Sequence, residues 1–266
     1  MLLLHLFKLQ FIMNSVIAPK FLQKTPEIEK MIADFGSNDN IIVKGKRNII
    51  KKDTLGNLPV TIKAFKVPNA INSIAYRFFR KSKAQRSYEY ANILLGKNIG
   101  TPKPVAYFEN KTASGFKESY YICEYLNYDF MFRDITKGYP DYENIMKQFV
   151  AFCYELHEKG IEFKDHSPGN TLIKKEAEGK YSFYLVDLNR MDFHTSMSFE
   201  QRMENLKRLT PEKEEVLLMS REYAKLYNKD ADEVFNMLWD KTSNFQKKFW
   251  RKKRIKGRLK SIKKLF

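Results

Sequence analysis

The chain has 266 residues and 43% of them are hydrophobic, so it can bury a substantial core, either as one large domain or as two lobes. This composition excludes a chain that is disordered throughout. The formal net charge is +17, and residues 247–266 hold eleven Lys or Arg and no Asp or Glu, so the rest of the chain carries only +6. Positive charge concentrated in this way favours an anionic partner such as nucleic acid, acidic lipid or a phosphorylated glycan.

Neither the start of the chain nor its cysteines indicate export. We assign residues 1–37 as an N-terminal extension with a short amphipathic helix over 26–35. The apolar run at 1–12 is too short to span a bilayer and no small-residue cleavage site follows it, so we predict no signal peptide. Cys123 and Cys153 match neither a metal site nor a disulfide framework. Buried free thiols in a reducing, cytoplasmic setting are therefore expected.

Residues 38–125 are predicted to form an N-lobe, a five-stranded antiparallel sheet with one main helix. Runs with strand alternation are separated by turn signals, and one longer run has helical spacing. The expected strands are 41–44, 48–52, 59–66, 104–109 and 119–124, and the expected helix is 73–95.

One lysine of the third strand is the candidate for binding nucleotide phosphates. Alternation places Lys63 on the face opposite Val60 and Ile62. A strand lysine in this position is what kinase-type folds use to pair the α- and β-phosphates. Lys66 competes for the role, and the argument from the strand face favours Lys63. Glu89, in the helix, is the candidate partner of Lys63, and its alternative is a solvent-facing helix glutamate.

Residues 126–245 are predicted to form a mostly helical C-lobe. Its first helix begins near Tyr142 and ends at Lys159, with Gly160 as the C-cap. A β-hairpin built from 171–173 and 181–186 follows. Two or three further helices are expected over 199–245.

The loop before that hairpin sets an Asp and an Asn five positions apart, at Asp165 and Asn170. In kinase-type phosphoryl transfer a loop Asp orients the acceptor hydroxyl and takes its proton, while an Asn and a second Asp hold the metal ions. Asp187, directly after the hairpin, fits the second Asp, and we expect the hairpin to deliver it beside Asn170. Pro168 fixes its own φ and Gly169 can adopt a positive φ, which would point both polar side chains into one cavity. The alternative is a solvated turn in which both side chains only cap the backbone.

Two histidines lie near this loop. His166 follows Asp165 directly, and His157 lies in the last turn of the preceding helix. We predict structural roles for both, with a partial positive charge on His157 that would be favourable at a helix C-terminus.

Residues 246–266 are assigned as a basic amphipathic tail. If the tail is helical, its apolar residues share a stripe about 140° wide, which suits a helix lying on an anionic membrane surface. The stripe consists of Phe245, Phe249, Ile255, Leu259, Ile262 and Phe266, and Gly257 weakens this pattern. A solvated basic end and RNA binding through phosphate contacts stay open as alternatives.

Five segments in a fixed order carry a family resemblance. They are Phe65–Pro68, Arg80–Glu89, Gly100–Pro104, Asp165–Asn170 and Val186–Met191. Together they resemble the bacterial lipopolysaccharide-core kinases, the Kdo/heptose kinase family of the protein-kinase-like superfamily, over roughly residues 40–195.

The resemblance implies an α+β, bilobal protein-kinase-like fold with ATP and Mg²⁺ as cofactors. Lys63 is implied as the catalytic lysine that pairs the nucleotide phosphates, with Glu89 as its partner. Asp165 is implied as the catalytic base, and Asn170 and Asp187 as the Mg²⁺ ligands.

Further candidates complete this set. Lys46, Arg47 and Glu124 are expected to contact the nucleotide. A basic cluster is expected to contact phosphates or carboxylates of the acceptor, and the alternative is that it only solvates a helix. It consists of Arg77, Arg80, Lys81, Lys83 and Arg86.

The chain departs from the superfamily pattern at three places. Phe163 replaces the histidine usually found two positions before the catalytic Asp, Leu188–Asn189 replaces the usual Phe-Gly, and the Gly-rich turn is reduced to Gly45–Asn48. The first change removes an imidazole that braces the loop, so Asp165 must be held by packing instead. The third suggests that Lys46 and Arg47 use side-chain charge where backbone amides usually bind phosphate.

The resemblance implies phosphorylation of a Kdo or heptose hydroxyl in the lipopolysaccharide inner core or a lipid A precursor. The enzyme would lie at the cytoplasmic face of the inner membrane, with its basic tail on the anionic surface, and nucleic acid is not expected as a partner. Two alternatives stay open: a protein or small-molecule kinase with a soluble acceptor, and a non-catalytic pseudokinase that binds RNA or membrane.

Overall fold

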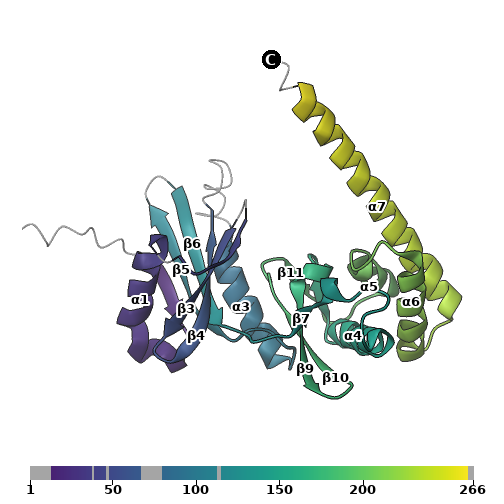
Figure 1. Ribbon diagram of the computed structural model, residues 1–266, viewed down its shortest axis with the longest axis horizontal. Coiled ribbons are helices and arrows are strands. Elements are labelled where there is room, and N and C mark those ends of the chain that lie inside the picture. The colour runs from purple at the N-terminus through teal and green to yellow at the C-terminus, as the bar shows by residue number, and fades with distance from the viewer. Residues whose placement is uncertain (1–12, 38, 46–47, 67–79, 113–114, 263–266) are drawn as a thin grey trace, which may run out of the picture. The chain divides into compact units, whose positions relative to one another are not determined.

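The computed structural model describes all residues except 1–12, 38, 46–47, 67–79, 113–114 and 263–266. The chain divides into two compact units, Met1–Asn127 and Tyr128–Phe266. The first unit is a sheet with helices, and the second is mainly helical (Figure 1).

The first unit is built on one antiparallel sheet of six strands, in the order β1-β5-β6-β4-β3-β2. Its elements are β1 (Asn14–Ile17), α1 (Thr25–Ala33), β2 (Ile41–Lys44), β3 (Asn48–Leu55), β4 (Leu58–Phe65), α3 (Lys83–Gly96), β5 (Pro104–Thr112) and β6 (Gly115–Glu124). The prediction of five strands is wrong because β1 adds to the edge of the sheet, where Ser15 faces Phe108 of β5. A four-residue segment carries too little alternation to be identified, and its pairing with β5 defines it as a strand.

Helix α1 covers one face of the sheet and helix α3 covers the other (Figure 1). Ile28 of α1 is fully buried in one cluster with Ile62 of β4, and Ala84 of α3 is fully buried in another with Tyr121 of β6. Complete burial of one aliphatic side chain stabilises a fold by about 1.5–3 kcal/mol. The alternation along β4 therefore gives Ile62 to the α1 face and leaves its neighbour Lys63 on the α3 face.

Helix α3 begins later than the helical spacing predicted. Ser82 caps it, since its Oγ accepts a hydrogen bond from the backbone N–H of Gln85 at 3.0 Å. The described residues 80–82 are not helical, and residues 73–79 of the predicted helix lie outside the described part of the chain.

The second unit packs four helices with two small sheets, ordered β10-β9-β7 and β11-β8. Its elements are β7 (Phe130–Met131), α4 (Tyr142–Glu158), β8 (Ile161–Phe163), β9 (Thr171–Ala177), β10 (Lys180–Leu185), β11 (Met191–Phe193), α5 (Phe199–Leu206), α6 (Lys213–Tyr227) and α7 (Ala231–Ile262). The predicted hairpin, as β9 and β10, and the predicted helices are confirmed.

Helix α4 supplies much of the core of the second unit. All five residues of its apolar stripe are buried, and they are Ile145, Phe149, Phe152, Cys153 and Leu156. Phe149 stacks on Phe132 with ring centroids 3.8 Å apart. Gly160 ends the helix at φ +70°, and a Cβ atom there would lie 1.9 Å from the carbonyl oxygen of His194. Both its left-handed conformation and this close approach therefore require glycine.

Helix α7 has a packed beginning and an exposed continuation. Val234, Leu238 and Thr242 are buried where it packs on α5 and α6, and the helix then projects beyond them (Figure 1). Every residue of 247–257 is exposed. As far as Ile262, the last residue that the structure describes, the predicted basic tail thus continues α7 without a break. Among the residues that the structure describes, no helix combines the length and apolarity needed to cross a membrane.

Candidate active site

The turn after β8 brings together the residues predicted for catalysis and metal binding. The chain folds back through a 3-10 turn at Pro168–Asn170. Nδ2 of Asn170 donates a hydrogen bond to the backbone oxygen of Asp165 at 2.9 Å. The backbone N–H of Val186 donates to the backbone oxygen of Asn170 at 3.0 Å. The expectation that the β9–β10 hairpin brings Asp187 beside Asn170 is therefore confirmed.

Gly169 has a different role from the predicted one. It lies within the 3-10 turn and is not among the residues with positive φ, so the left-handed conformation is not used. A Cβ atom at this position would lie 1.6 Å from Nη2 of Arg133. The missing side chain instead makes room for the Arg133 guanidinium against the loop.

The predicted metal ligands offer oxygen donors, which are the donors that Mg²⁺ prefers. Because Nδ2 of Asn170 donates its hydrogen bond to the Asp165 backbone oxygen, Oδ1 of Asn170 is the side-chain atom left for a cation. Asp187 has a φ of +61°, a left-handed conformation that Asp and Asn tolerate better than most residues. Its Oδ1 accepts a hydrogen bond from Nδ2 of Asn189 at 2.6 Å. The chemistry of this donor set fits Mg²⁺.

Two arginines to which the sequence analysis gave no role bind the Asp165 carboxylate. Nη1 of Arg190 donates to its Oδ1 at 3.0 Å, and Nη1 of Arg208 donates to the same oxygen at 2.8 Å. Arg208 also donates to the backbone oxygen of Lys164 at 3.0 Å. Arg190 lies in a segment of the family resemblance, whereas no local pattern links Arg208 to Asp165, which lies 43 positions away.

A buried network supports the loop at Phe163. The backbone oxygen of Phe163 accepts hydrogen bonds from the backbone N–H of His166 and from Nδ2 of Asn205, both at 2.9 Å. Oδ1 of Asn205 lies 3.2 Å from Nε2 of His157, whose Nδ1 lies 2.7 Å from the Tyr223 hydroxyl. Since Oδ1 can only accept, Nε2 of His157 carries the proton and Nδ1 accepts from Tyr223. The fully buried Phe163 ring also stacks on His166, so packing and a network from α4, α5 and α6 replace the missing histidine.

Both histidines near the loop are buried and neutral. Burial lowers the pKa of His157 to about 3 and that of His166 to about 4. The structural role is thus consistent with their surroundings, but the expected positive charge on His157 is wrong. At this site the cost of burying a charge outweighs the favourable interaction with the helix end.

Lowering the pH from 7 to 5 is expected to reduce the free energy of unfolding by about 2 kcal/mol for each of these histidines. The unfolded chain takes up protons below pH 6.5 while the folded chain, with its depressed pKa values, does not, so stability falls with pH across this window. Urea unfolding at both pH values measures the effect. His166→Leu should remove about half of it, since the ring nitrogens of His166 make no hydrogen bond among the described residues. An unchanged pH dependence in this variant would contradict the assignment.

In the first unit, Lys63 lies half-buried on the α3 face of the sheet. Its Nζ lies 5.3 Å from the centroid of the Phe65 ring. Tyr121 is its register partner on β6, and Cys123 follows two positions later on the same face. Burial raises the pKa of Cys123 to about 11, against the opposing effect of the Lys63 charge. Lys63 therefore lies on the face opposite Ile62, as the alternation predicted, and its role stays a prediction.

Glu89 is engaged on its own helix. Its Oε2 lies 2.7 Å from Nζ of Lys81, and its Oε1 accepts a hydrogen bond from Nε2 of Gln85 at 3.0 Å. Glu89 lies on α3, the helix that covers the same face of the sheet as Lys63. A pair between Glu89 and Lys63 stays a prediction, and it requires Glu89 to leave Lys81 or to bind both lysines.

The remaining candidates belong to the first unit. Oε1 of Glu124 lies 3.7 Å from Nζ of Lys20, at the end of β6. In the predicted acceptor cluster, Lys83 lies over the Phe65 ring at 5.9 Å and Nε of Arg86 donates to the Ser82 oxygen at 3.4 Å, while Arg80 is exposed. Lys46, Arg47 and Arg77 lie outside the described residues. The roles of all these residues stay predictions.

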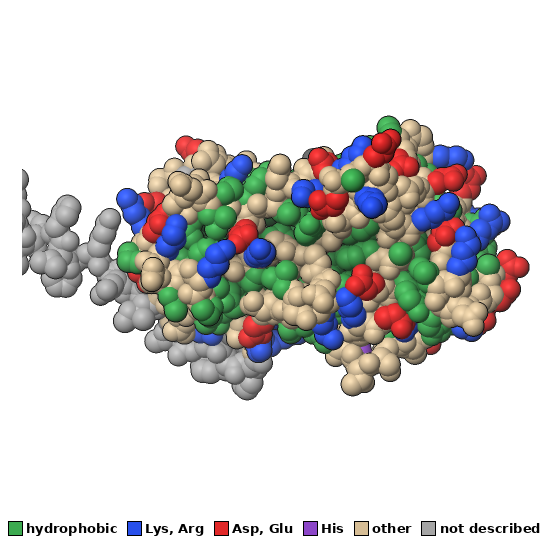
Figure 2. Space-filling view, turned by 90° about the horizontal axis from the view of Figure 1, so that it is seen from below, with side chains coloured by type: hydrophobic (Ala, Val, Ile, Leu, Met, Phe, Trp, Pro, Cys, Tyr) green, Lys and Arg blue, Asp and Glu red, His purple; other side chains and the backbone are tan. Residues whose placement is uncertain are grey.

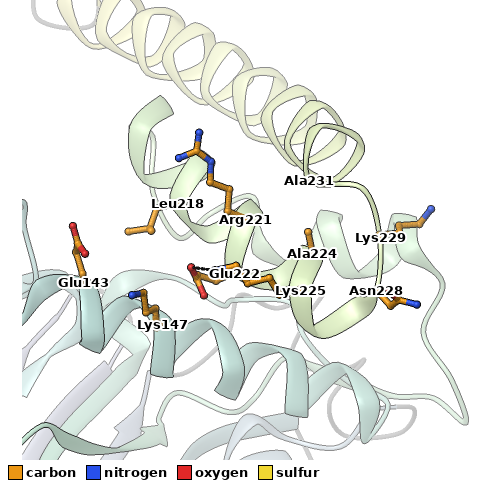
Figure 3. Close-up of a pocket in the computed structure, with 10 residues that line it drawn as sticks. All are labelled: Glu143, Lys147, Leu218, Arg221, Glu222, Ala224, Lys225, Asn228, Lys229 and Ala231. Atoms are coloured by element: carbon orange, nitrogen blue, oxygen red, sulfur yellow. Dashed lines mark hydrogen bonds and ion pairs between the residues drawn. The ribbon is translucent and has the colours of Figure 1, made fainter.

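A surface pocket of about 600 Å³ lies elsewhere in the second unit, between α4, α6 and the start of α7 (Figure 3). Its lining includes Lys147 of α4, Arg221 of α6 and Asn228 of the following turn. Lys225 and Glu222 pair within it at 2.7 Å. None of the predicted catalytic or metal-binding residues lines this pocket, so we assign it no part in the site.

Comparisons with known proteins agree with the fold and with the family resemblance. A model of the lipopolysaccharide kinase (Kdo/WaaP) family matches residues 70–229, more than half of the chain. A solved structure of WaaP in complex with acyl carrier protein matches with a TM-score of 0.58 and 13% identity, over 89% of this chain and 98% of that one. This likeness shows the predicted α+β, protein-kinase-like fold.

Two further results complete the comparison. A Rio2 kinase–ADP/Mg²⁺–phosphoaspartate complex from Chaetomium thermophilum matches with a TM-score of 0.45 and 13% identity, over 79% of this chain and 65% of that one. No match was found among curated protein sequences.

Proposed function

The chain belongs to the lipopolysaccharide kinase (Kdo/WaaP) family, and from this premise we propose that it transfers the γ-phosphoryl group of ATP to a hydroxyl of Kdo or heptose in a lipopolysaccharide inner-core or lipid A precursor. The observation that carries this proposal is the turn that gathers Asp165, Asn170 and Asp187. In it the Asn170 side chain donates a hydrogen bond to the Asp165 backbone oxygen, and the Val186 N–H donates one to the Asn170 backbone oxygen. These are the residue types that phosphoryl transfer needs in one place.

In the proposed mechanism the protein mainly positions reactants and neutralises charge, because a loose phosphoryl-transfer transition state needs little covalent chemistry. Asp165 orients the acceptor hydroxyl and accepts its proton. Asn170 and Asp187 would hold Mg²⁺, which when bound neutralises charge on the phosphates. Lys63 pairs with the nucleotide phosphates. The network at Phe163 fixes the backbone from which Asp165 projects.

The test uses purified protein, γ-labelled ATP and Mg²⁺ with acceptors that separate the alternatives. Lipid A precursors carrying Kdo alone, or Kdo and heptose, are compared with a peptide and an aminoglycoside. We expect label only on the glycolipids. Label confined to the peptide or the aminoglycoside would favour a protein or small-molecule kinase with a soluble acceptor. Absence of ATP turnover together with RNA binding that weakens steeply with salt would favour the pseudokinase.

We further propose that the end of α7 contacts the anionic surface of the inner membrane. On the face shown in Figure 2, Lys and Arg are interspersed with Asp and Glu, whereas residues 247–257 hold seven Lys or Arg and no acidic residue. Phe249 and Trp250 are 49% and 52% exposed on this segment, and Ile255 is 48% exposed. Basic and aromatic side chains together suit a membrane interface.

The exposed apolar residues of this segment do not all lie on the predicted stripe. Trp250 lies about 100° round the helix from Phe249, outside the stripe. Leu259, Ile262 and Phe266 lie outside the residues whose side chains the structure describes. Attraction by the basic residues therefore carries more of the proposed contact than a continuous apolar face.

Cosedimentation with vesicles tests the membrane proposal. Binding to vesicles rich in anionic lipid is expected to exceed binding to neutral vesicles by at least tenfold and to fall with salt, because each basic residue near such a surface contributes about 1 kcal/mol. A variant with Arg251, Lys252 and Lys253 changed to Gln should lose most of it, and one with exposed Lys137, Lys175 and Lys180 changed to Gln should not. The WaaP neighbour was solved with acyl carrier protein. Binding to acyl carrier protein but not to vesicles would assign the helix to a protein partner instead.

A further inference from the structure

The Asp165 carboxylate lies in an arginine cluster with an excess of positive charge. Arg190 and Arg208 both donate to a single oxygen of Asp165, at 3.0 and 2.8 Å. The side chain of Asp165 is 24% exposed, that of Arg208 33% and that of Arg190 56%. Two guanidinium groups and one carboxylate leave one net positive charge at the surface beside the proposed catalytic base.

Most hydrogen-bond donors of the two guanidiniums are not used by the contacts of the described residues. Each guanidinium has five N–H groups in a planar fork. Arg190 contacts Asp165 through Nη1, and Arg208 contacts Asp165 and the Lys164 oxygen, also through Nη1. Arg208 is further held over the Phe245 ring, with its guanidinium carbon 5.4 Å from the centroid. The fork is thus fixed in place while retaining donors that can bind a second anion.

The nearby carboxylate of Asp192 does not serve as that second anion, because it is paired with a lysine. Lys164 forms an ion pair with Asp192 of β11. This pair is neutral in sum and leaves the charge of the arginine cluster unchanged. An oxyanion of a ligand is therefore the chemically matched partner, since arginine binds carboxylate and phosphate in a bidentate fashion.

We propose that Arg190 and Arg208 form an acceptor subsite that binds an acidic group of the sugar whose hydroxyl Asp165 orients. This inference rests on the proposed function and specifies its substrate. Kdo carries a carboxylate, whereas heptose itself is neutral, so the subsite selects Kdo or another acidic sugar. A phosphate on the acceptor offers similar chemistry, and the experiment separates the two.

The test is a double-mutant-type cycle, in which the enzyme loses the Arg190 guanidinium and the acceptor loses the charge of the Kdo carboxylate. Wild type and Arg190→Gln are compared on a Kdo-bearing lipid A precursor and on the same precursor with the Kdo carboxylate converted to a neutral amide. Wild type is expected to prefer the free acid by about 30- to 100-fold in kcat/KM, the range for a charge-assisted bidentate contact. Arg190→Gln should lose this preference, so that its kcat/KM values on the free acid and on the amide become similar. Arg190→Lys should recover only part, because lysine cannot bind the carboxylate with a fork.

Other outcomes overturn or redirect the assignment. An equal loss on both acceptors would mean that Arg190 only holds Asp165, and no preference in the wild type would remove the subsite. If the wild type tolerates the amide but loses a similar factor in kcat/KM on the dephosphorylated lipid, the anion is a phosphate and the selection of Kdo is wrong. Calorimetric binding of the same acceptors without ATP repeats the cycle independently of turnover. Failure of the proposed function, which is absence of transfer to every acceptor, therefore differs from failure of the subsite.

Discussion

Asp165→Asn is expected to lower kcat for glycolipid phosphorylation by about 10²- to 10⁴-fold, the range attributed to a general base. The variant keeps an oxygen that can accept from Arg190 and Arg208, so the loop should keep its conformation while losing the proton acceptor. KM for ATP should change little, because the carboxylate acts on the acceptor. Initial rates of label transfer at saturating ATP measure both quantities.

Asp192→Asn is the matched control for that experiment. Asp192 is also a partly exposed carboxylate with a basic partner, and it pairs with Lys164, next to Asp165 in the sequence. It has no proposed part in catalysis, so its kcat should stay within about twofold of the wild type, as for a surface ion pair. Equal losses in the two variants, or full activity of Asp165→Asn, would contradict the role of Asp165.

Asp187→Asn is expected to reduce activity by about 10³-fold at low Mg²⁺ and to raise the Mg²⁺ concentration for half-maximal activity at least tenfold. Removing the charged oxygen weakens a hard-cation site, while Asn tolerates the left-handed backbone at this position. Asparagine is therefore a cleaner substitution than alanine, which would add backbone strain. Titration of activity with Mg²⁺, and of Mn²⁺ binding by electron paramagnetic resonance, gives the two affinities.

Asn189→Ala provides a graded comparison for Asp187. Nδ2 of Asn189 donates to Oδ1 of Asp187, so its loss should loosen the carboxylate without removing a metal ligand. A loss of about tenfold or more in metal affinity is expected for such a supporting contact. If Asp187→Asn leaves the Mg²⁺ requirement unchanged, Asp187 is not a metal ligand and other residues must hold the Mg²⁺ ion.

The sequence was most informative where function constrains a short segment. Asp165 and Asn170 are close in the chain, and turn chemistry with the following hairpin was enough to predict that Asp187 returns beside them. The strands of the sheet were likewise visible from their alternation. The edge strand β1 was not, because pairing with β5 rather than its own pattern makes it a strand.

Contacts between distant parts of the chain could not be read in this way. The role of Arg208 depends on α5 ending near a loop 43 positions earlier, and the bond from Asn205 to Phe163 spans 42 positions. The expected charge on His157 was wrong for the same reason, since its burial comes from packing against Tyr223 of α6. Gly169 was identified as special, but its reason, the approach of Arg133, is also a tertiary contact.

The central claim is phosphoryl transfer to an inner-core sugar from a turn built on Asp165. Mass spectrometry of the Kdo-bearing lipid A precursor, after incubation with ATP, Mg²⁺ and either wild type or Asp165→Asn, tests it most directly. We predict a product with one added phosphoryl group on the sugar, formed by the wild type and reduced at least a hundredfold with the variant. An unmodified glycolipid in the wild-type reaction, or equal product from both proteins, would contradict the claim.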